Sequence, residues 1–505
     1  MSAQAAVATA RRAAHQPLAA LLAGMAEKVP DLNVSGVQLD SRRVQPGDLF
    51  LACKGLRDHG LKFAGQAQQQ GAAAVAWEPD TDLRKIELGV PSVAVPALAR
   101  RAGEIASRYY QSPSERLFVA GITGTDGKTS TAYLLAQALD LLGKHCGYLG
   151  TLGAGRTQAL QRGDFTTPDA VALQATLAGF VDQGMHAAAM EVSSHALDQA
   201  RVGGVSFDVA VLTNIGRDHL DYHGDEHRYA AAKHLLFRWP GLRAALLNRD
   251  DAHGSAWAHE LDAPVDCVLY GVDGMAPRGN RYLLARDLQC GAAGLQFKLD
   301  SSWGKAEVQA ALLGRFNAYN LLAVLGVLLE SGVAINDAVA LLGKLQPVPG
   351  RMERLSLPNG ASAVIDYAHT PQALQHALKA CRAHAGGRLI CVFGCGGDRD
   401  RGKRPQMGAA AAAGAELCIV TDDNPRSEAS SQITEEILAG MSGHEATEVI
   451  HDRAEAIARA VELAGADDLL LIAGKGHEDY QLRGEQRLHF SDREQLLAQG
   501  AVVPA

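Results

Sequence analysis

The sequence predicts an α/β protein that is divided into three domains. Short apolar runs alternate with helix-like stretches along most of the chain, which is typical of parallel sheets covered by helices. The chain has 505 residues. This is too long for one hydrophobic core and corresponds to about three domains of roughly 150 residues each. We place the domains at residues 1–114, 115–346 and 347–505.

Residues 1–114 are predicted to form a small α/β domain. Apolar runs such as GDLFLAC alternate with polar turns, of which QPGD at residues 45–48 is an example. The stretch PLAALLAGMA predicts a first helix. The arginines before it, with no acid until Glu27, faintly resemble a targeting peptide, but the apolar run is short and leads directly into folded-looking sequence. The segment SPSE, at residues 112–115, is interpreted as a linker.

Residues 115–346 are predicted to form a mostly parallel sheet that binds ligands at the carboxyl ends of its strands. The strand-like runs LFVAGI, HAAAMEV, FDVAVLTN and RAALLN alternate with helical stretches. Residues 266–313 are expected to be antiparallel strands inserted before the helix NAYNLLAVLGVLLESG. After the proline-marked boundary QPVPGRMERL, the strand-like runs SAVIDYA, RLICVFGCG, ELCIVTDD and DDLLLIAGKG predict a third, Rossmann-like block.

The composition is that of an ordinary globular protein, with 47% hydrophobic and 21% charged residues. A net charge of −8 argues against a general nucleic-acid binder, which carries a basic face. No apolar run reaches the ~18 residues that span a bilayer. The eight cysteines form no C-x-x-C pair. We therefore expect a cytoplasmic protein with no nucleic-acid partner, no membrane insertion and no disulfides.

The segment GITGTDGKTS, residues 121–130, predicts a phosphate-binding loop. It lies between an apolar strand and a helix, so that backbone N–H groups and the helix N-terminus can surround phosphate oxygens. Lys128 adds a positive charge, and Thr129 offers a hydroxyl to Mg²⁺. The common form of this loop has a glycine where this chain has Ile122. A chance glycine turn is the alternative.

Three further side chains at strand ends or on a helix of the same segment are of the metal-binding type. They are Glu191 in AMEVSSHALDQAR, His219 in TNIGRDHLDYHG and Lys233 in YAAAKHLLF. Each alone is more often a solvated or capping residue. Together, in a domain with a phosphate loop, the carboxylate and the imidazole are plausible Mg²⁺ ligands.

The chain resembles the Mur ligases in a series of motifs that keep their order and spacing. The motifs are GTDGKTS, EVSSHALDQ followed by Arg201, TNIGRDHLDYHG, GRFNAYN, GRMER, IDYAHTP, GCGGDRDRGKRP, DDNPRSE and AGKGHEDYQ. The resemblance extends from LDSR near residue 40 to FSDRE near residue 494. It implies a small α/β uridine-binding domain, a central P-loop-type ATPase domain and a C-terminal Rossmann-like domain that binds an amino acid. It also implies a monomer that acts in peptidoglycan precursor synthesis.

The resemblance implies that ATP phosphorylates the terminal carboxylate of a nucleotide-linked peptide. The amine of an amino acid then attacks the acyl phosphate, and the products are a peptide bond, ADP and phosphate. The triphosphate is expected on Gly124, Thr125, Asp126, Gly127, Lys128, Thr129 and Ser130. Further nucleotide contacts are expected from Asn317, Asn320, Arg351 and Asp366, for which helix caps and a surface arginine are the alternative.

In the same family pattern, Glu191 and His219 match Mg²⁺ ligands, and Lys233 matches a carbamylated lysine. Carbon dioxide would convert the Lys233 ammonium, which repels Mg²⁺, into a carbamate anion that helps to hold a second ion. Lys128, His219 and Lys233 are therefore the expected catalytic residues, and Thr129 completes the metal set. An ordinary lysine on an alanine-rich helix is the alternative for Lys233.

The implied peptide substrate is UDP-N-acetylmuramoyl-L-alanyl-D-glutamate, which would lie across the first two domains. Leu39 and Ser41 match positions of the uridine site. Positions that match contacts to the diphosphate and the muramyl group are Thr166, Thr167, Ser193, Gln199 and Arg201. The chain departs from the family pattern in GLRDHG at residues 55–60, which includes Leu56, and in Phe165, where an asparagine is usual.

The amino acid implied by the resemblance is meso-diaminopimelate. The residues that carry this pattern are Arg399, Asp423, Asn424, Pro425, Arg426, Gly474 and Glu478. Diaminopimelate has a second carboxylate beside its distal amine, and arginine can bind such a carboxylate through two hydrogen bonds. A lysine substrate would leave Arg426 without a partner, at a cost of about 1–3 kcal/mol.

Several alternatives stay open. A sibling ligase would add lysine or D-Ala-D-Ala, and DNPR argues against both. A folylpolyglutamate synthase is not expected to carry LDSR followed by PGDLF. A GTP-dependent switch is suggested by LNRDD, residues 247–251, in which Arg249 stands where a guanine reader has lysine, although a strand-end turn explains this segment better.

Asp126 stands where the family usually has asparagine. A carboxylate beside a triphosphate is repelled unless a cation or N–H groups hold it. We expect Asp126 to turn away from the phosphates or to accept local backbone hydrogen bonds. Because three segments bind the substrates, closure of the domains is expected to bring the reacting atoms together.

Overall fold

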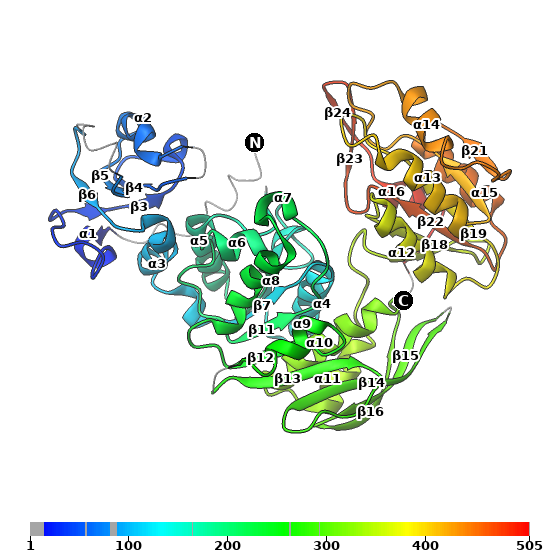
Figure 1. Ribbon diagram of the computed structural model, residues 1–505, viewed down its shortest axis with the longest axis horizontal. Helices are drawn as coiled ribbons and strands as arrows, with labels where there is room; N and C mark the ends of the chain where they lie inside the picture. The colour runs from blue at the N-terminus through cyan, green and yellow to red at the C-terminus, as the bar shows by residue number, and fades with distance from the viewer. Residues whose placement is uncertain are drawn as a thin grey trace. The chain divides into compact units, whose positions relative to one another are not determined.

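The computed structural model describes residues 15–55, 58–80, 88–163, 165–261, 264–291 and 293–503. The chain forms two compact units (Figure 1). The first contains residues up to 271 with 275–283 and 323–333, and the second contains 272–274, 284–322 and the chain from 334 onward. The division into three domains stays a prediction. Leu56, which belongs to the departure noted in GLRDHG, and the arginine-bearing N-terminus before residue 15 lie outside the described residues.

The N-terminal part of the first unit is built on a parallel sheet with the strand order β3-β4-β5-β6. Its elements are β1 (Gln16–Pro17), α1 (Leu18–Leu21), β2 (Asn33–Val34), β3 (Gly36–Gln38), β4 (Asp48–Ala52), α2 (Ala64–Gln69), β5 (Ala74–Trp77), β6 (Ser92–Ala94) and α3 (Leu98–Tyr109). The predicted first helix is confirmed over Leu18–Leu21 only. The expected linker is a 3₁₀ turn instead, and the buried Ser114 accepts a hydrogen bond from Ser206 N at 2.9 Å.

The larger sheet of the first unit has the order β13-β12-β11-β7-β10-β8-β9. The strands are β7 (Phe118–Thr123), β8 (Cys146–Gly150), β9 (Gly153–Gly155), β10 (Ala187–Glu191), β11 (Val209–Leu212), β12 (Ala244–Asn248) and β13 (Asp266–Val272). All pairs are parallel except β8 with β9. The four strands expected between residues 115 and 250 are confirmed. The expectation that residues 266–313 are all antiparallel is wrong for β13, because Val268 pairs in parallel with Leu246.

Helices cover this sheet, so its central strands β7, β10 and β11 are buried except at Phe118, which is half-buried. They are α4 (Lys128–Leu141), α5 (Ala170–Asp182), α6 (Ser194–Asp198), α7 (Leu220–His223), α8 (Glu226–His234) and α9 (Ala252–Trp257). The register pairs Glu191 of β10 with Ile122 of β7, and Leu212 of β11 with Thr123 of β7. The carboxyl ends of these strands therefore lie at one edge, where the phosphate loop begins.

The second unit contains an antiparallel part and a mostly parallel part. The elements that precede the mostly parallel part are β14 (Arg281–Gly291), β15 (Gly294–Ser301), β16 (Gly304–Ala310), α10 (Phe316–Glu330) and α11 (Ile335–Leu342). The start of β14 and the end of α10, residues 281–283 and 323–330, belong to the first unit. β15 and β16 pair antiparallel, as expected. No described helix is long and apolar enough to span a membrane.

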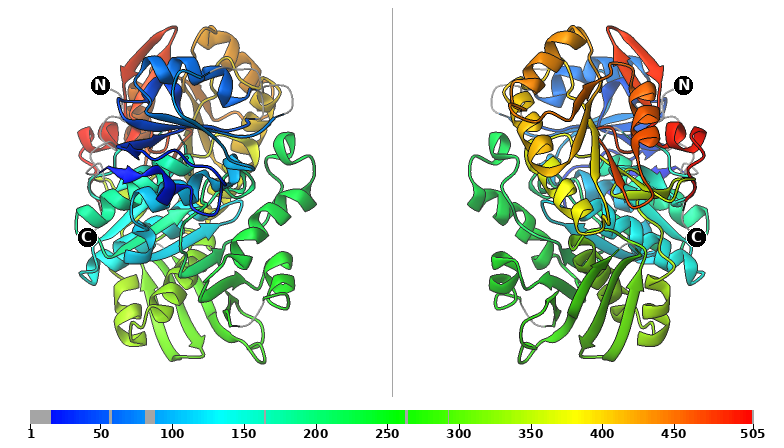
Figure 2. Two further views of the ribbon diagram at one scale, coloured as in Figure 1. Left: turned by 90° about the vertical axis from the view of Figure 1, so that its left-hand side faces the viewer. Right: turned by 90° about the vertical axis from the view of Figure 1, so that its right-hand side faces the viewer.

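The mostly parallel sheet has the order β17-β18-β22-β19-β20-β21. Its elements are β17 (Glu353–Ser356), β18 (Ser362–Asp366), α12 (Pro371–Arg382), β19 (Leu389–Phe393), α13 (Lys403–Gly414), β20 (Leu417–Val420), α14 (Ser430–Leu438), β21 (Thr447–Val449), α15 (Arg453–Leu463), β22 (Leu469–Ala473), the hairpin β23 (Tyr480–Arg483) and β24 (Gln486–His489), and α16 (Asp492–Ala498). Leu469 and Leu471 pack toward α12, α13 and α14, whereas Leu470 and Ile472 pack toward α15 and α16. This sheet is therefore covered on both faces (Figure 2), and the Rossmann-like expectation is confirmed.

Candidate active site

The phosphate loop joins the end of β7 to the start of α4, as the sequence predicts. Gly124 and Gly127 have φ values of +147° and +80°, which favour glycine. A methyl group at Gly124 would lie 1.9 Å from Thr213 Oγ1, so no side chain fits there without displacing Thr213. Lys128 Nζ donates hydrogen bonds to the Gly124 and Thr125 carbonyls, both at 2.8 Å. The loop carbonyls therefore surround the amine of Lys128, the residue with which α4 begins.

The backbone of Asp126 is held by hydrogen bonds to Thr213 and Asn214. Its N–H donates to Asn214 Oδ1 at 3.0 Å, and its carbonyl accepts from Thr213 Oγ1 at 2.6 Å and from Asn214 Nδ2 at 3.1 Å. The side chain is exposed, and no hydrogen bond to its carboxylate occurs among the described residues. Of the two expectations for Asp126, local hydrogen bonds are made by its main chain and not by its carboxylate, and the expectation that the side chain turns away from the phosphates stays a prediction. Asn214 was not predicted, although its position at the end of the run FDVAVLTN was a signal.

Lys233, on α8, is buried beneath the same loop. Its Nζ donates to the Gly124 carbonyl at 2.7 Å and lies 4.5 Å from the centre of the Tyr229 ring. Burial, together with the positive charge of Lys128, lowers the pKa of Lys233 to about 6. The amine of Lys233 is therefore largely neutral at pH 7.

Glu191, at the end of β10, is fully buried and surrounded by donors. Oε2 accepts from Thr129 Oγ1 at 2.9 Å and from Thr151 Oγ1 at 3.2 Å. Oε1 accepts from Tyr148 O–H at 2.5 Å and from Thr151 N at 2.8 Å. The structure therefore joins two predicted metal ligands, Thr129 and Glu191. Tyr148 and Thr151 were missed, because only strand pairing brings them to Glu191.

His219 lies apart from these contacts. It is exposed, has φ +52°, and lies 3.3 Å from Asp218 and 4.7 Å, between ring centres, from His195. No hydrogen bond joins it to Glu191 or Lys233 among the residues that the structure describes. Across the same residues, no group of three His, Cys, Asp or Glu side chains is arranged to hold a metal ion. A metal ion beside Thr129 and Glu191 would take oxygen ligands from both side chains, a donor set that suits Mg²⁺.

The residues expected to bind the diphosphate and muramyl groups form one connected cluster. Arg201 donates to Gln199 Oε1 through Nε at 2.9 Å and Nη2 at 2.6 Å, and to the Thr167 carbonyl through Nη1 at 3.1 Å. Thr167 Oγ1 donates to the carbonyl of Glu191 and accepts from Ser193 N. Burial lowers the pKa of Arg201.

Thr166 joins this cluster to the metal ligands through Thr151, with 3.1 Å between the two hydroxyl oxygens. Phe165, the departure from the family pattern, is 61% exposed, and its ring lies 5.3 Å from the Arg201 guanidinium. The expected uridine residues lie in the N-terminal part of the chain. Ser41 donates to Gln66 Oε1 at 2.7 Å, and Leu39 packs at the edge of the N-terminal core.

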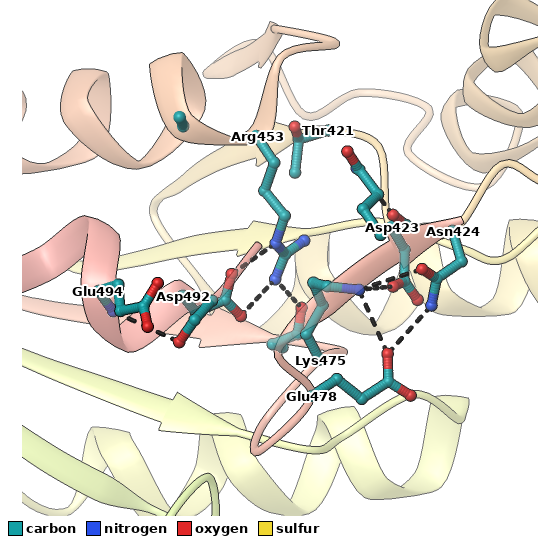
Figure 3. A network of polar contacts seen from close by, with 12 residues as sticks. Thr421, Asp423, Asn424, Arg453, Lys475, Glu478, Asp492 and Glu494 are labelled. Atoms are coloured by element: carbon teal, nitrogen blue, oxygen red, sulfur yellow. Dashed lines mark hydrogen bonds and ion pairs between the residues drawn. The ribbon is translucent and has the colours of Figure 1, made fainter. Parts of the chain in front are cut away.

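In the second unit, the loops after β20 and β22 form a polar network around a fully buried lysine (Figure 3). Lys475 Nζ lies 3.2 Å from both Asn424 Oδ1 and Glu478 Oε2, and 3.5 Å from Asp423 Oδ1. Asn424 Nδ2 also donates to Glu478 Oε2 at 3.1 Å. Three predicted amino-acid-binding residues are therefore brought together. Lys475 was missed, although a lysine between two glycines at a strand end was a signal.

Arg426 has a left-handed backbone, with φ +52°, and its Nη1 donates to the Gly397 carbonyl at 2.8 Å. This contact joins the loop after β20, which includes Pro425, to the loop after β19. Arg399 lies in the latter loop and is exposed. Gly474, with φ +115°, begins the loop that carries Lys475.

The remaining predicted nucleotide residues also lie in the second unit. The Arg351 guanidinium lies 4.9 Å from the Tyr367 ring centre. Asp366 accepts hydrogen bonds from Met352 N and Ala368 N, both at 2.9 Å. Burial raises the pKa of Asp366, and the charge of Arg351 opposes this shift.

The two asparagines at the start of α10 are buried, and one of them bonds to the turn that precedes the helix. Asn317 Nδ2 donates to the Leu313 carbonyl at 2.7 Å, and Asn320 Nδ2 donates to Asn317 Oδ1 at 2.8 Å. The segment LNRDD is a strand-end turn: Asn248 Nδ2 donates to the Thr213 carbonyl, and Asp251 caps α9. The side chains of this turn are thus committed to backbone contacts.

Comparison with known proteins identifies the family. Three sequence profiles match, namely "Mur ligase family, catalytic domain" over residues 33–110, "Mur ligase middle domain" over 122–328 and "Mur ligase, glutamate ligase domain" over 350–476. The chain belongs to the Mur ligase family.

Two relatives show how close this Mur ligase is to named enzymes. The UDP-N-acetylmuramoyl-L-alanyl-D-glutamate–2,6-diaminopimelate ligase of Alkalilimnicola ehrlichii is 50% identical, with 92% of this chain and 95% of that protein covered. The protein of the same name from Pseudomonas aeruginosa is 47% identical, with 92% and 94% covered. A solved structure of a ligase of that name has 37% identity and a TM-score of 0.73, and the match covers 96% of this chain and 98% of that one.

Proposed function

We propose that this Mur ligase joins meso-diaminopimelate to UDP-N-acetylmuramoyl-L-alanyl-D-glutamate at the expense of ATP, as a step of peptidoglycan precursor synthesis. The observation that carries the proposal is the amino-acid network of Asp423, Asn424, Lys475 and Glu478 beside Arg426, in a chain half identical to ligases named for this reaction. The network offers carboxylates to amines, and Arg426 offers a guanidinium to a second carboxylate. Diaminopimelate has both groups at its distal end.

The phosphate loop supports the use of ATP. The N-terminus of α4 and the loop amides suit phosphate oxygens, and Lys128 and Lys233 converge on Gly124 from two sides. Mg²⁺, when bound, would neutralise charge on the transferred phosphoryl group. Thr129 and Glu191 are the residues that would hold it, with His219 as the third proposed ligand. The peptide carboxylate attacks the terminal phosphate of ATP, which releases ADP and forms an acyl phosphate. The amine of the amino acid then attacks the acyl carbon, and a peptide bond forms as phosphate leaves and the amine loses a proton.

We propose that Lys233 carries a carbamate. Carbon dioxide reacts with a neutral amine and not with an ammonium, and burial with Lys128 nearby keeps the amine of Lys233 neutral near pH 7. A bond forms between Nζ and the carbon of carbon dioxide and a proton is released, so that an anion replaces a neutral amine, and its oxygens suit a second Mg²⁺.

The carbamate is tested by chemical rescue. Lys233→Ala should lose almost all activity, because both the anion and its metal contact are removed. Short carboxylates such as acetate should restore part of it by taking the place of the carbamate. The exposed Lys62 offers a matched control, and Lys62→Ala should keep wild-type activity without acetate. Failure of acetate to restore a folded Lys233→Ala protein would contradict the proposal.

The function is tested by incubating the protein with ATP, Mg²⁺ and UDP-N-acetylmuramoyl-L-alanyl-D-glutamate, with either diaminopimelate or lysine. We expect phosphate release and a product of the mass of the diaminopimelate adduct. A lysine adduct as the main product would establish the lysine-adding sibling instead. GTP binding without product would favour a regulatory switch.

Arg426→Ala tests which group selects the amino acid. We expect the KM for diaminopimelate to rise by about ten- to a hundredfold, because a guanidinium–carboxylate interaction is lost. Turnover of lysine should stay poor, since lysine has no distal carboxylate. Unchanged diaminopimelate kinetics in Arg426→Ala would refute the assignment.

A further inference from the structure

Two neighbouring loops of the second unit are joined to each other along their length. One follows β19 and contains Gly397 and Asp398, and the other follows β20 and contains Asn424 to Ser427. Gly397 N donates to the Asn424 carbonyl at 2.9 Å, and Ser427 Oγ donates to Asp398 Oδ1 at 2.6 Å. A methyl group at Gly397 would lie 1.9 Å from the Pro425 carbonyl oxygen, so only glycine permits this approach.

The side chain of Arg404 lies beneath both loops and is fully buried. Nη1 and Nη2 each lie within 2.9 Å of one oxygen of Glu428, and Nη1 also lies 2.8 Å from Glu436 Oε2. Nη2 donates to the Gly396 carbonyl at 3.3 Å. Arg404 comes from α13, so one side chain holds the first loop through Gly396 and the second through Glu428.

Glu428 extends this connection back to the first loop. Its Oε1, which already pairs with Arg404, accepts a hydrogen bond from Asp398 N at 2.5 Å. The ion pair with Arg404 lowers the pKa of Glu428 to about 2, so the carboxylate keeps its charge throughout the neutral range. The two loops carry Arg399 and Arg426, the guanidiniums assigned to the amino-acid substrate.

We propose that Arg404 is a positioning residue that sets the selectivity for diaminopimelate, by holding the loop of Arg399 and the loop of Arg426 in one arrangement. The inference rests on the proposed function. Arg426 needs such support because its backbone is left-handed, with φ +52°, a conformation that surrounding contacts must hold for a residue other than glycine. A guanidinium that is already oriented binds a carboxylate without first losing rotational freedom. When Arg404 is replaced, Arg426 is still present, but its guanidinium is no longer held in one orientation.

The test compares Arg404→Met with Arg401→Met. Arg401 lies at the end of the loop after β19 and also pairs with Glu436, but its side chain is 55% exposed, and among the described residues it forms no ion pair with Glu428. In Arg404→Met we expect the KM for diaminopimelate to rise about tenfold, while the KM for ATP and kcat at saturation change by less than about threefold. Arg401→Met should change every constant by less than about twofold.

The ratio of kcat/KM for diaminopimelate to that for lysine distinguishes positioning from general destabilisation. A partly unfolded enzyme loses both values equally, so the ratio stays at its wild-type level. Loss of positioning lowers only the value for diaminopimelate, because lysine does not use Arg426 through a distal carboxylate. We expect the ratio to fall about tenfold in Arg404→Met. An unchanged ratio would overturn the inference.

Glu428→Gln provides the second variant, which decides the question if Arg404→Met does not fold. The amide oxygen can still accept from Asp398 N, while the charge that pairs with Arg404 is gone. We expect the same fall in the ratio, by a smaller factor, and a wild-type ratio in folded Glu428→Gln would refute the role of the pair. If wild-type protein adds lysine in preference to diaminopimelate, the proposed function itself fails, which is a different result.

Discussion

At the scale of single residues, the Gly124 carbonyl accepts hydrogen bonds from both Lys128 and Lys233. Two ammonium groups this close would repel each other, and the structure resolves the conflict through burial. The pKa of Lys233 falls to about 6, so that at neutral pH one of the two amines is uncharged. The same shift makes Lys233 the one that can react with carbon dioxide.

The stability of the folded protein should therefore depend on Lys233 between pH 6 and pH 10. Unfolded, this lysine binds a proton below its ordinary pKa of 10.5, whereas in the folded protein it does so only below about 6. The unfolded chain binds more protons between these values, so this group makes the free energy of unfolding rise with pH across the window. Below pH 6 both states are protonated and the contribution is constant.

Urea unfolding in carbon dioxide-free buffer measures this dependence. The difference in unfolding free energy between wild type and Lys233→Met should shift in favour of wild type as the pH rises from 6 to 9. The exposed Lys62 serves as the control, since Lys62→Met should show a constant difference. A constant difference for Lys233→Met would show that Lys233 is protonated in the folded protein.

At the scale of elements, the turn from β7 into α4 depends on the contact between Gly124 and β11. Thr213, which follows β11, donates to the Asp126 carbonyl and lies where a methyl group on Gly124 would be. The loop, the strand end and the start of α4 therefore form one rigid arrangement. Glycine is needed at position 124 because the chain passes against Thr213 here.

Gly124→Ala should reduce ATP turnover by about a hundredfold, because displacing Thr213 moves the loop by about an ångström from its phosphate-binding position. Gly143→Ala is the matched control. Gly143, beyond the end of α4, also has a positive φ, of +74°, but a methyl group there meets no atom within 4 Å. Both variants should lose about 1 kcal/mol of stability through backbone strain.

Phosphate release measures the turnover of ATP, and calorimetric titration with ADP and Mg²⁺ measures the affinity for the nucleotide. Only Gly124→Ala should lose nucleotide affinity. Equal nucleotide affinity in the two alanine variants would mean that the contact with Thr213 is not what shapes the loop.

At the scale of the whole molecule, the proposed ligands divide between the two compact units. Every residue assigned to the UDP-linked peptide lies in the first unit, and every residue assigned to diaminopimelate lies in the second. Each unit has hydrophobic clusters of its own. The second is also held by a fully buried pair, in which Arg453 and Asp492 are joined by two hydrogen bonds of 2.7 and 2.8 Å.

Scanning calorimetry should therefore show two unfolding transitions that respond to different ligands. Diaminopimelate should raise the melting temperature of one transition, and the UDP-linked dipeptide should raise that of the other. At a concentration of a hundred times its Kd, each ligand should stabilise the unit that binds it by about 2.7 kcal/mol. Asp492→Ala identifies the transition of the second unit, because it leaves Arg453 buried without its partner and should cost about 3–5 kcal/mol.

Arg459→Ala is the control for Asp492→Ala. It breaks an ion pair with Glu448 in which both side chains are more than a third exposed, and it should cost less than about 1 kcal/mol. A single transition that both ligands raise together would contradict the division into two independently cooperative units.

Features that depend on neighbours in the sequence were predictable. The phosphate loop is one, because a glycine-rich turn between an apolar strand and a helix is a local pattern. The strands of both parallel sheets are others, since long buried apolar runs have few alternatives. The loop after β20 was singled out differently, through the resemblance of DNPR to the Mur ligase pattern, and its role in binding the amino acid stays a prediction.

Contacts between residues far apart in the sequence were not predictable, because they depend on strand order and register. The parallel pairing of β13, the donors Tyr148 and Thr151 around Glu191, and the buried Lys475 and Arg404 all depend on such pairings. The amino-acid sequence thus determined which chemical groups this ligase has and in which element each lies. Folding determined which of them meet, because only packing removes water from Lys233, which lowers its pKa, and places Arg404 against Glu428 and Glu436.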